Sequence, residues 1–362
     1  MKIGILSMQE VKNYGSFLQA YSLKKNIELL GHTCDFINIK PGEQIGEYKV
    51  EKFHKLRLLM QRLLGWDFIT RLKYIYLFQS RFKKEFLPEL GVKNGFVNNY
   101  GHHYDTVVIG SDEVFNCAQK TWFGFSPQLF GEGLNADKVI SYAGSFGATT
   151  TKILEKLGLK QRVASYLKNN FSAISIRDNN SYEVVKSLTG IEPILNVDPV
   201  ILNDWKKYMP KEHVPLSNYM IVYTYPGRIS DKNEISAIKE YAKSHQLKLI
   251  SIGHYFPWVD KTIVPHPFEV LAYFRDANCI VTDTFHGSIF SIKNNRQFCT
   301  IVRNMNSNKL TYLLKQFGLE NRIVNDINNL SAILDSPIDY EPVNSVIEKE
   351  TINGLNYLKS NL

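Results

Sequence analysis

Short apolar runs alternate along this chain with segments whose apolar residues recur at helical spacing. Residues 2–8 form the first apolar run, 17–30 have helical spacing and stop at Gly31, and 33–39 form a second apolar run. This strand–helix–strand order predicts an α/β fold with a parallel, doubly wound sheet, in which ligands bind beyond the carboxyl ends of the strands.

The same alternation continues to the end of the chain and predicts two domains. Apolar runs resume at 105–109, 139–142 and 173–176, and after a connector near 194–215 they recur at 219–225, 247–252, 279–281, 298–302 and 322–324. Helical spacing fills the intervals, including 154–169 and 182–188. We predict a Rossmann-like domain over 1–195, with a basic helical insertion at about 50–90, and a second over 196–340. A helix within 341–362 is expected to pack back on the first domain. Two such halves facing a cleft resemble the GT-B architecture.

The net charge of +8 is concentrated in the inserted segment. Between Lys52 and Lys84 nine basic residues face one acid, Asp67, which gives 9 − 1 = +8, and leucines and aromatic residues lie between them. This pattern is typical of a helix on an anionic membrane surface, and amphipathic helices with a solvated basic face explain it as well. We expect no nucleic-acid partner because no nucleic-acid-binding module accompanies the patch.

Composition also indicates which classes of protein this chain does not resemble. No apolar run reaches the roughly 18 residues of a membrane span, and the N-terminus does not resemble a signal peptide. The four cysteines form no C-x-x-C pair, so we read them as reduced thiols of a cytoplasmic protein, with a possible place at the inner face of the cell membrane. The nine histidines show no ligand spacing with Cys or Glu, so no metal site is predicted.

The stretch TDTFHGSIFS at 282–291 is the strongest candidate for chemistry. It follows a buried strand and continues as a helix, so His286 and Gly287 lie where free backbone N–H groups and the positive end of the helix dipole meet. Such a turn binds anions, and a His there can also carry a proton. The alternative is a capping turn with a purely structural His.

Other polar residues follow predicted strands and are candidates for the same ligand edge. Arg177 suits a bidentate contact with phosphate or carboxylate, although it could instead pair with a surface carboxylate. Asp112 could accept a proton or simply cap a helix. Asn13 and Tyr14 are harder to explain by capping than Ser16 is. The further candidates for substrate binding are Gly15, Ser111, Gly144, Ser145, Thr284, Gly287, Ser288, Arg303 and Lys309.

Six of these stretches, in this order, resemble the polysaccharide pyruvyl transferases. They are NYGSFLQAYSL at 13–23, DTVVIGSDEVFN at 105–116, SYAGSFG at 141–147, ISIRDNNS at 174–181, NVDPVIL at 196–202 and TDTFHGSIFSI at 282–292. The resemblance implies a GT-B-like fold, phosphoenolpyruvate as donor and co-substrate without a separate cofactor, and a pyruvate ketal formed on a sugar of a surface-polysaccharide precursor. It also implies that Arg177 and His286 face the donor.

The chain departs from the family pattern at a few positions. Glu113 and Phe115 stand where Gln and Trp are common, Thr284 replaces Ser, and Asp178 replaces Glu. Asn308 and Lys309 stand where Ser and Arg are common, which shifts an anion contact from arginine to lysine.

These residues suggest a mechanism. Arg177 would hold one anion of phosphoenolpyruvate bidentately, and the N–H groups of Gly287 and Ser288 would hold the other. His286 would act as the acid and Asp112 as the base. The expected acceptor is a sugar, including a polyprenyl-diphosphate-linked oligosaccharide, and the sequence leaves a 4,6-ketal and a 3,4-ketal open. A GT-B glycosyltransferase with a nucleotide-sugar donor, and a non-catalytic scaffold on the membrane, are the alternatives.

Overall fold

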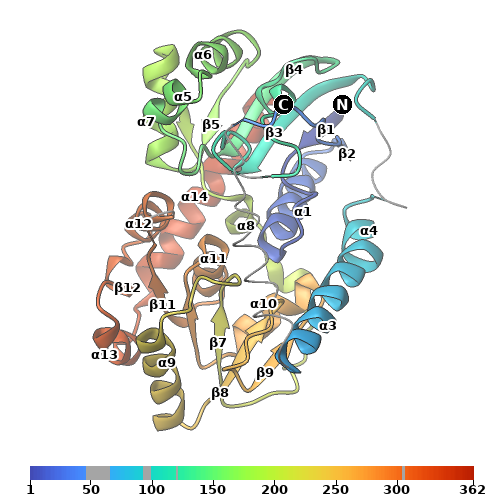
Figure 1. Cartoon of the computed structure of the whole chain (residues 1–362). Helices are drawn as coiled ribbons and strands as arrows, with labels where there is room; N and C mark the ends of the chain where they lie inside the picture. The colour runs from blue at the N-terminus through green and yellow to red at the C-terminus, as the bar shows by residue number, and fades with distance from the viewer. Residues whose placement is uncertain (46–65, 93–98, 120, 304–305) are drawn as a thin grey trace.

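The N-terminal domain of the computed structural model is built on a parallel sheet. The structure describes residues 1–45, 66–92, 99–119, 121–303 and 306–362. Within them the first sheet has the order β2-β1-β3-β4-β5-β6 (Figure 1). Its strands are β1 (Lys2–Leu6), β2 (Thr33–Phe36), β3 (Tyr104–Asp112), β4 (Ala136–Gly144), β5 (Ser175–Ile176) and β6 (Ile194–Leu195), and its helices are α1 (Tyr14–Leu29), α5 (Thr151–Lys156), α6 (Lys160–Asn169) and α7 (Asn179–Thr189).

The C-terminal domain repeats this plan with a second parallel sheet, ordered β12-β11-β10-β7-β8-β9. Its strands are β7 (Tyr219–Tyr223), β8 (Lys248–Ile252), β9 (Lys261–Ile263), β10 (Cys279–Thr282), β11 (Gln297–Ile301) and β12 (Ile323–Val324). Its helices are α9 (Lys232–Ser244), α10 (Pro267–Asp276), α11 (Phe285–Lys293), α12 (Ser307–Gln316) and α13 (Leu330–Asp335), and the short α8 (Pro199–Leu202) lies between the domains. The predicted pair of Rossmann-like domains is therefore confirmed.

Several local predictions need correction. Helix α1 begins at Tyr14 rather than at residue 17, because the Asn13 side-chain oxygen accepts from the Ser16 N–H at 2.7 Å and caps it. The helix expected over 154–169 is two helices. Gly158 adopts a φ of +70° between α5 and α6, a conformation that ends a helix and favours glycine.

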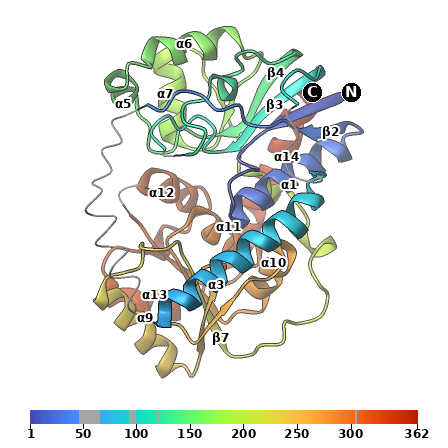
Figure 2. The ribbon, with the colours of Figure 1, turned by 45° about the vertical axis from the view of Figure 1, so that its right-hand side comes forward.

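The described part of the basic insertion packs onto both domains. It comprises α3 (Trp66–Arg81), the π-helix η1 (Phe82–Phe86) and α4 (Leu87–Glu89). Phe78, Phe82 and Phe86 are buried, and the Phe86 ring contacts both Tyr14 of α1 and His266 before α10. Figure 2 shows α3 crossing from the first domain to the second.

The opposite side of α3 is open to solvent. Ile69, Leu72 and Tyr76 are exposed there, and so is Lys73. Residues 46–65, which carry the first part of the predicted membrane surface, lie outside the described residues. No helix in the part of the chain that the structure describes is long and apolar enough to cross a bilayer. Contact with a membrane surface stays a prediction.

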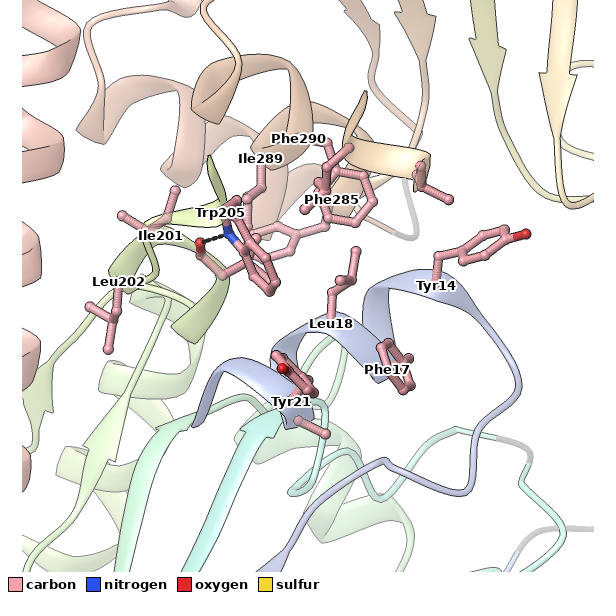
Figure 3. Close-up of a cluster of buried hydrophobic side chains, with 14 of the residues drawn as sticks. Tyr14, Phe17, Leu18, Tyr21, Ile201, Leu202, Trp205, Phe285, Ile289 and Phe290 are labelled. Carbon is pink, nitrogen blue, oxygen red and sulfur yellow. Dashed lines mark hydrogen bonds between the residues drawn. The ribbon is translucent and has the colours of Figure 1, made fainter. Parts of the chain in front are cut away.

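A hydrophobic cluster joins the two domains (Figure 3). It brings Tyr14, Phe17, Leu18 and Tyr21 of α1 against Phe285, Ile289 and Phe290 of α11, with Ile201, Leu202 and Trp205 beside them. The Trp205 indole N–H donates to the Val200 carbonyl at 2.7 Å, so its polar atom is satisfied in the core. Because α1 and α11 share one core, the loops at their N-termini are held in a fixed relation.

The C-terminal helix α14 (Tyr340–Asn361) contacts both domains. At its start, the Tyr340 hydroxyl donates to the Arg296 carbonyl of the C-terminal domain. Near its end, the Tyr357 hydroxyl donates to the Ser141 carbonyl of β4 at 2.9 Å. Between these points, a Cβ atom on Gly354 would lie 2.5 Å from the Tyr142 hydroxyl, which explains a glycine inside this helix.

The Tyr357 hydrogen bond gives a test of this docking. We expect Tyr357→Phe to lower the free energy of unfolding by about 1 kcal/mol, because a buried bond is lost while the ring stays in place. Urea unfolding measures the change, with Tyr76→Phe at an exposed position as the matched control. Equal stability of the Tyr357→Phe variant and the wild type would contradict the assigned role of α14.

Candidate active site

Arg177 lies at the centre of a charged cluster between the domains. It follows β5, and its side chain is 1% exposed. Its Nη2 donates to Asp112 Oδ1 at 2.8 Å, and its Nη1 donates to Asp198 Oδ2 at 2.5 Å. The Phe285 ring lies 4.3 Å from the guanidinium carbon, in a cation–π contact. Burial opposes its charge, but Asp112 and Asp198 outweigh burial, and the pKa of Arg177 is raised.

His286 reaches the same carboxylate from the other domain. It lies in the first turn of α11, and its Nε2 is 3.4 Å from Asp198 Oδ2, a distance longer than that of a well-formed hydrogen bond. Nε2 has no hydrogen-bond partner within the described residues. The other side of the ring rests on α1, where a Cβ atom added to Gly15 would be 2.2 Å from Nδ1. Gly15 therefore leaves the space that the imidazole occupies.

Asp198 contacts both Arg177 and His286, and it is not among the site residues predicted from the sequence. Its carboxylate is fully buried, caps α8 by accepting from the Val200 N–H at 3.1 Å, and lies 3.4 Å from the Ser111 hydroxyl. Burial alone would raise its pKa, but His286 and Arg177 lower it, so Asp198 stays ionised at neutral pH. The stretch NVDPVIL was read as a connector. An acid that follows a strand and precedes Pro was the available signal.

Lys309 and Glu113 form a second ion pair across the domains. Lys309, from α12, bonds to Glu113 Oε1, while Asn116 Nδ2 donates to Oε2 of the same carboxylate at 2.6 Å. Burial raises the pKa of Glu113, but Lys309 and the hydrogen bond from Asn116 lower it, and the net shift of the pKa is downward. The side chains of Lys309, Glu113 and Asp112 are 18%, 22% and 15% exposed, so they form the outer layer over Arg177 and His286.

Asp112 ends β3 and caps no helix, so the capping alternative is wrong. Its φ of +74° is uncommon for a residue with a side chain, and such backbone strain is often found at functional sites. The carboxylate is fixed by Arg177 and by the Ser16 hydroxyl, which donates to Oδ2 at 3.0 Å. Burial opposes ionisation of Asp112, but Arg177, His286 and Lys309 together lower its pKa.

The prediction that Gly287 and Ser288 offer free N–H groups is wrong. Thr284 caps α11: its hydroxyl accepts from the Gly287 N–H at 2.9 Å, and its carbonyl accepts from the Ser288 N–H at 3.2 Å. Gly287 serves packing instead, because a Cβ atom there would lie 2.2 Å from the Thr282 hydroxyl. The first-turn N–H groups of Phe285 and His286 have no acceptor among the residues that the structure describes.

Two other predicted ligand loops are used by the fold itself. In the first loop, Asn13 caps α1. Tyr14 is buried, and its hydroxyl donates to the Pro265 carbonyl at 2.8 Å. The turn with Gly144 and Ser145 is no phosphate cradle. The Ser145 N–H donates to the Asp112 carbonyl at 2.9 Å, and the Ser145 hydroxyl donates to Asp178 at 2.6 Å.

Arg303 and Ser111 support neighbouring parts of the cluster. The Arg303 guanidinium binds the Glu234 carboxylate through two bonds of 2.6 and 2.7 Å, so it is not a free anion contact. Its Nε lies 3.8 Å from Asp283, which precedes the cap of α11. The Ser111 hydroxyl donates to the Ala143 carbonyl at 3.0 Å and so ties β3 to β4.

The described residues contain one group with spacing suited to a metal ion, formed by His103, Asp105 and Asp137. Asp105 is at the amino end of β3, whereas Asp112 is at the carboxyl end, so this group lies away from the cluster. His103 already contacts Asp137 at 3.0 Å, and Asp105 accepts from the Lys2 N–H at 2.6 Å. We assign no role to it.

Comparison with solved structures shows the fold. The glycotransferase of kitacinnamycin is 11% identical, with a TM-score of 0.51 and coverage of 100% of this chain and 98% of that one. UGT89C1 of Arabidopsis thaliana, solved with UDP, is 10% identical, with a TM-score of 0.50 and coverage of 99% and 98%. The Thermobaculum terrenum O-GlcNAc transferase is 12% identical at a TM-score of 0.43, and this chain spans 64% of its length. At these identities the first two support the GT-B-like architecture only.

Comparison with protein families is more specific than the structural likeness. Residues 13–304 match the family described as polysaccharide pyruvyl transferase, a span that contains Asp112, Arg177, Asp198 and His286. The comparison with curated proteins gave no match. Because the family match covers most of the 362 residues, the chain belongs to the polysaccharide pyruvyl transferase family.

Proposed function

We propose that this transferase moves the pyruvyl group of phosphoenolpyruvate onto two hydroxyls of a sugar in a polysaccharide precursor and forms a ketal. One observation carries the proposal: Arg177 and His286, from different domains, contact the same carboxylate of Asp198. A cation and a proton carrier are thereby held together in a buried interdomain cluster. This is the combination that protonation of an enol phosphate requires.

The charge balance of the cluster fits a ligand with two anionic groups. Phosphoenolpyruvate carries its carboxylate and its phosphate on the same carbon. Arg177 and Lys309 supply two basic side chains; Arg177 is paired with both Asp112 and Asp198, and Lys309 is paired with Glu113. Arg177 therefore has no free pair of N–H groups for a bidentate contact, since only its Nε lacks a partner among the described residues. We propose that the substrate replaces Asp112 and Glu113 at these cations.

In the proposed reaction His286 acts as the acid. It donates a proton to the methylene carbon, and the central carbon becomes an oxocarbenium-like electrophile. One sugar hydroxyl adds to that carbon, the carbon–oxygen bond to phosphate breaks, and a second hydroxyl closes the ketal. Of the two hydroxyl protons, one is taken up by Asp112 and passes to the departing phosphate, which leaves as hydrogen phosphate, and the other restores His286. Asp198 orients the imidazole throughout.

Asp112 is the proposed base. Next to Arg177 its pKa is low, so in the arrangement described above it is a weak base. If the substrate takes over Arg177, Asp112 loses a cationic neighbour and becomes more basic at the moment when the acceptor hydroxyl must be deprotonated. Its position in the outer layer, 15% exposed, is compatible with reaching a hydroxyl of the sugar.

Variants at the two central residues test the assignment. We expect His286→Ala and Arg177→Lys each to lower ketal formation from phosphoenolpyruvate by about 10²-fold or more, because a proton donor or a two-armed cation is lost. Arg177→Lys is preferred to Arg177→Ala, which would leave two buried carboxylates facing each other. Mass spectrometry of candidate saccharides follows the gain of one pyruvic acid less water.

The matched control is His103→Ala, since that side chain is 53% exposed and lies at the opposite end of β3 from the cluster. Thermal stabilisation of the wild type by phosphoenolpyruvate provides a readout that needs no acceptor. Near-normal turnover in either central variant would reject its role. Stabilisation by a nucleotide diphosphate and not by phosphoenolpyruvate would favour glycosyl transfer instead.

The contact between Gly15 and His286 gives a second test. We expect Gly15→Ala to lower kcat by about 10²-fold, because the added methyl group must push the imidazole from its place. The change in the free energy of unfolding should stay within about 1–3 kcal/mol. Gly101→Ala is the control, since a Cβ atom there meets nothing within 4 Å. An unchanged kcat would show that the position of the ring against α1 does not matter for turnover.

Glu113 allows the proposed exchange of ion pairs to be measured. We expect Glu113→Gln to lower KM for phosphoenolpyruvate severalfold, because Lys309 is released while the amide oxygen still accepts from Asn116. Lys309→Met should raise KM by about tenfold. Glu43→Gln, which removes a surface ion pair with Arg162, is the control. A higher KM in Glu113→Gln would mean that Glu113 positions the domains and is not displaced by the substrate.

A further inference from the structure

A groove whose lining residues all carry a polar group in their side chains runs between the two domains beside the charged cluster. It has a volume of about 820 Å³ and lies between α7 and α12, which face each other across the domain boundary in Figure 1. Asn179, on one wall, is two residues after Arg177, and Asn308, on the other, precedes Lys309. The groove is lined by Asn179, Asn180, Glu183, Ser307, Asn308, Thr311, Tyr312, Lys315 and Gln316.

Some of the groove's side chains are used by the fold and others form no hydrogen bond within the described residues. Asn180 belongs to the first group, because its amide donates to the carbonyls of Gly147 and Thr149, both at 3.0 Å. Amide side chains can donate and accept at once, as sugar hydroxyls do. The lining side chains that form no hydrogen bond or ion pair within the described residues are those of Asn179, Glu183, Asn308, Thr311, Lys315 and Gln316.

The charge of the groove differs from that of the cluster beside it. Its lining contains one acid, Glu183, and one base, Lys315, so its formal charge is zero. A nucleotide diphosphate carries two or more negative charges, and only Lys315 would attract them, while the Glu183 carboxylate would repel them. An uncharged, hydroxyl-rich ligand meets no such opposition. Tyr312 adds a partly buried ring, which offers an apolar surface and a hydroxyl to the same ligand.

We infer that this groove binds the saccharide part of the acceptor, as an uncharged sugar held between α7 and α12. The inference rests on the proposed function, which needs two sugar hydroxyls next to the donor. Asn179 and Asn308 contact the sugar from opposite walls. The reacting hydroxyls then point along the groove toward Asp112 and Lys309, which form the outer layer of the cluster.

The test combines the double variant Asn179→Ala/Asn308→Ala with a matched control. Both side chains are exposed and lie in the first turn of a helix. Asn233→Ala is the control because Asn233 is also exposed in the first turn of a helix, α9, and does not line the groove. The probes are a panel of uncharged p-nitrophenyl hexosides, with UDP and phosphoenolpyruvate as comparison ligands. Ligand-observed NMR measures binding to the full chain.

We expect at least one hexoside to bind the wild type and the Asn233→Ala control equally, and the double variant about tenfold more weakly, because two hydrogen bonds are lost. Phosphoenolpyruvate should bind the double variant within about twofold of the wild type, since the charged cluster is untouched. Full hexoside binding by the double variant would overturn the inference. Absence of hexoside binding to the wild type would overturn it too, as would UDP binding that the double variant loses.

These measurements separate the inference from the proposed function. If hexosides bind in the groove and phosphoenolpyruvate does not bind the wild type, the donor assignment fails while the saccharide site stands. If phosphoenolpyruvate binds and hexosides do not, the groove assignment fails while the donor site stands. Equal loss of both ligands in the double variant would place the two asparagines in the cluster and count against a separate groove.

Discussion

The buried carboxylate of Asp198 is the interaction on which the site depends. It is shared by a guanidinium from one domain and an imidazole from the other, and its own loop is fixed by the cap of α8. A buried charge is costly unless it is paired, and the Asp198 carboxylate is paired with Arg177 and contacts His286 of the other domain. The hydrophobic contact between α1 and α11 supplies the close approach that this pairing requires (Figure 3).

The sequence predicted the fold well because apolar periodicity is a local property. Parallel strands place their carboxyl ends at one edge of a sheet, so Asp112 and Arg177 were expected at the ligand edge of the first domain and His286 at that of the second, across the predicted cleft. What it could not predict were contacts between distant segments. Asp198 and His286 are 88 positions apart in the sequence, and Gly15 of α1 contacts the same imidazole ring. No local sequence pattern predicts either contact.

The errors at helix starts have one physical cause. A small polar residue beside a turn can bind a ligand or cap the helix, and both uses favour the same residue types. Asn13 and Thr284 cap their helices, which removes the N–H groups of Ser16 and Gly287 from any ligand. The sequence also could not reveal that Gly287 is needed for packing against Thr282, because that contact depends on the register of α11 on its strand.

The paired state of both cations bears on selectivity. Arg177 is paired with both Asp112 and Asp198, and Lys309 with Glu113, so an arriving anion that displaces Asp112 or Glu113 exchanges one ion pair for another and gains little from charge alone. A ligand with a single anionic group would bind only one of the two cations. It would displace that cation's carboxylate and leave the other ion pair intact. In the proposed exchange, a ligand with two anionic groups on one carbon would replace both carboxylates together, and the released acids would face the acceptor. Under this proposal, discrimination between anionic ligands would follow from the spacing of two charges rather than from the strength of either.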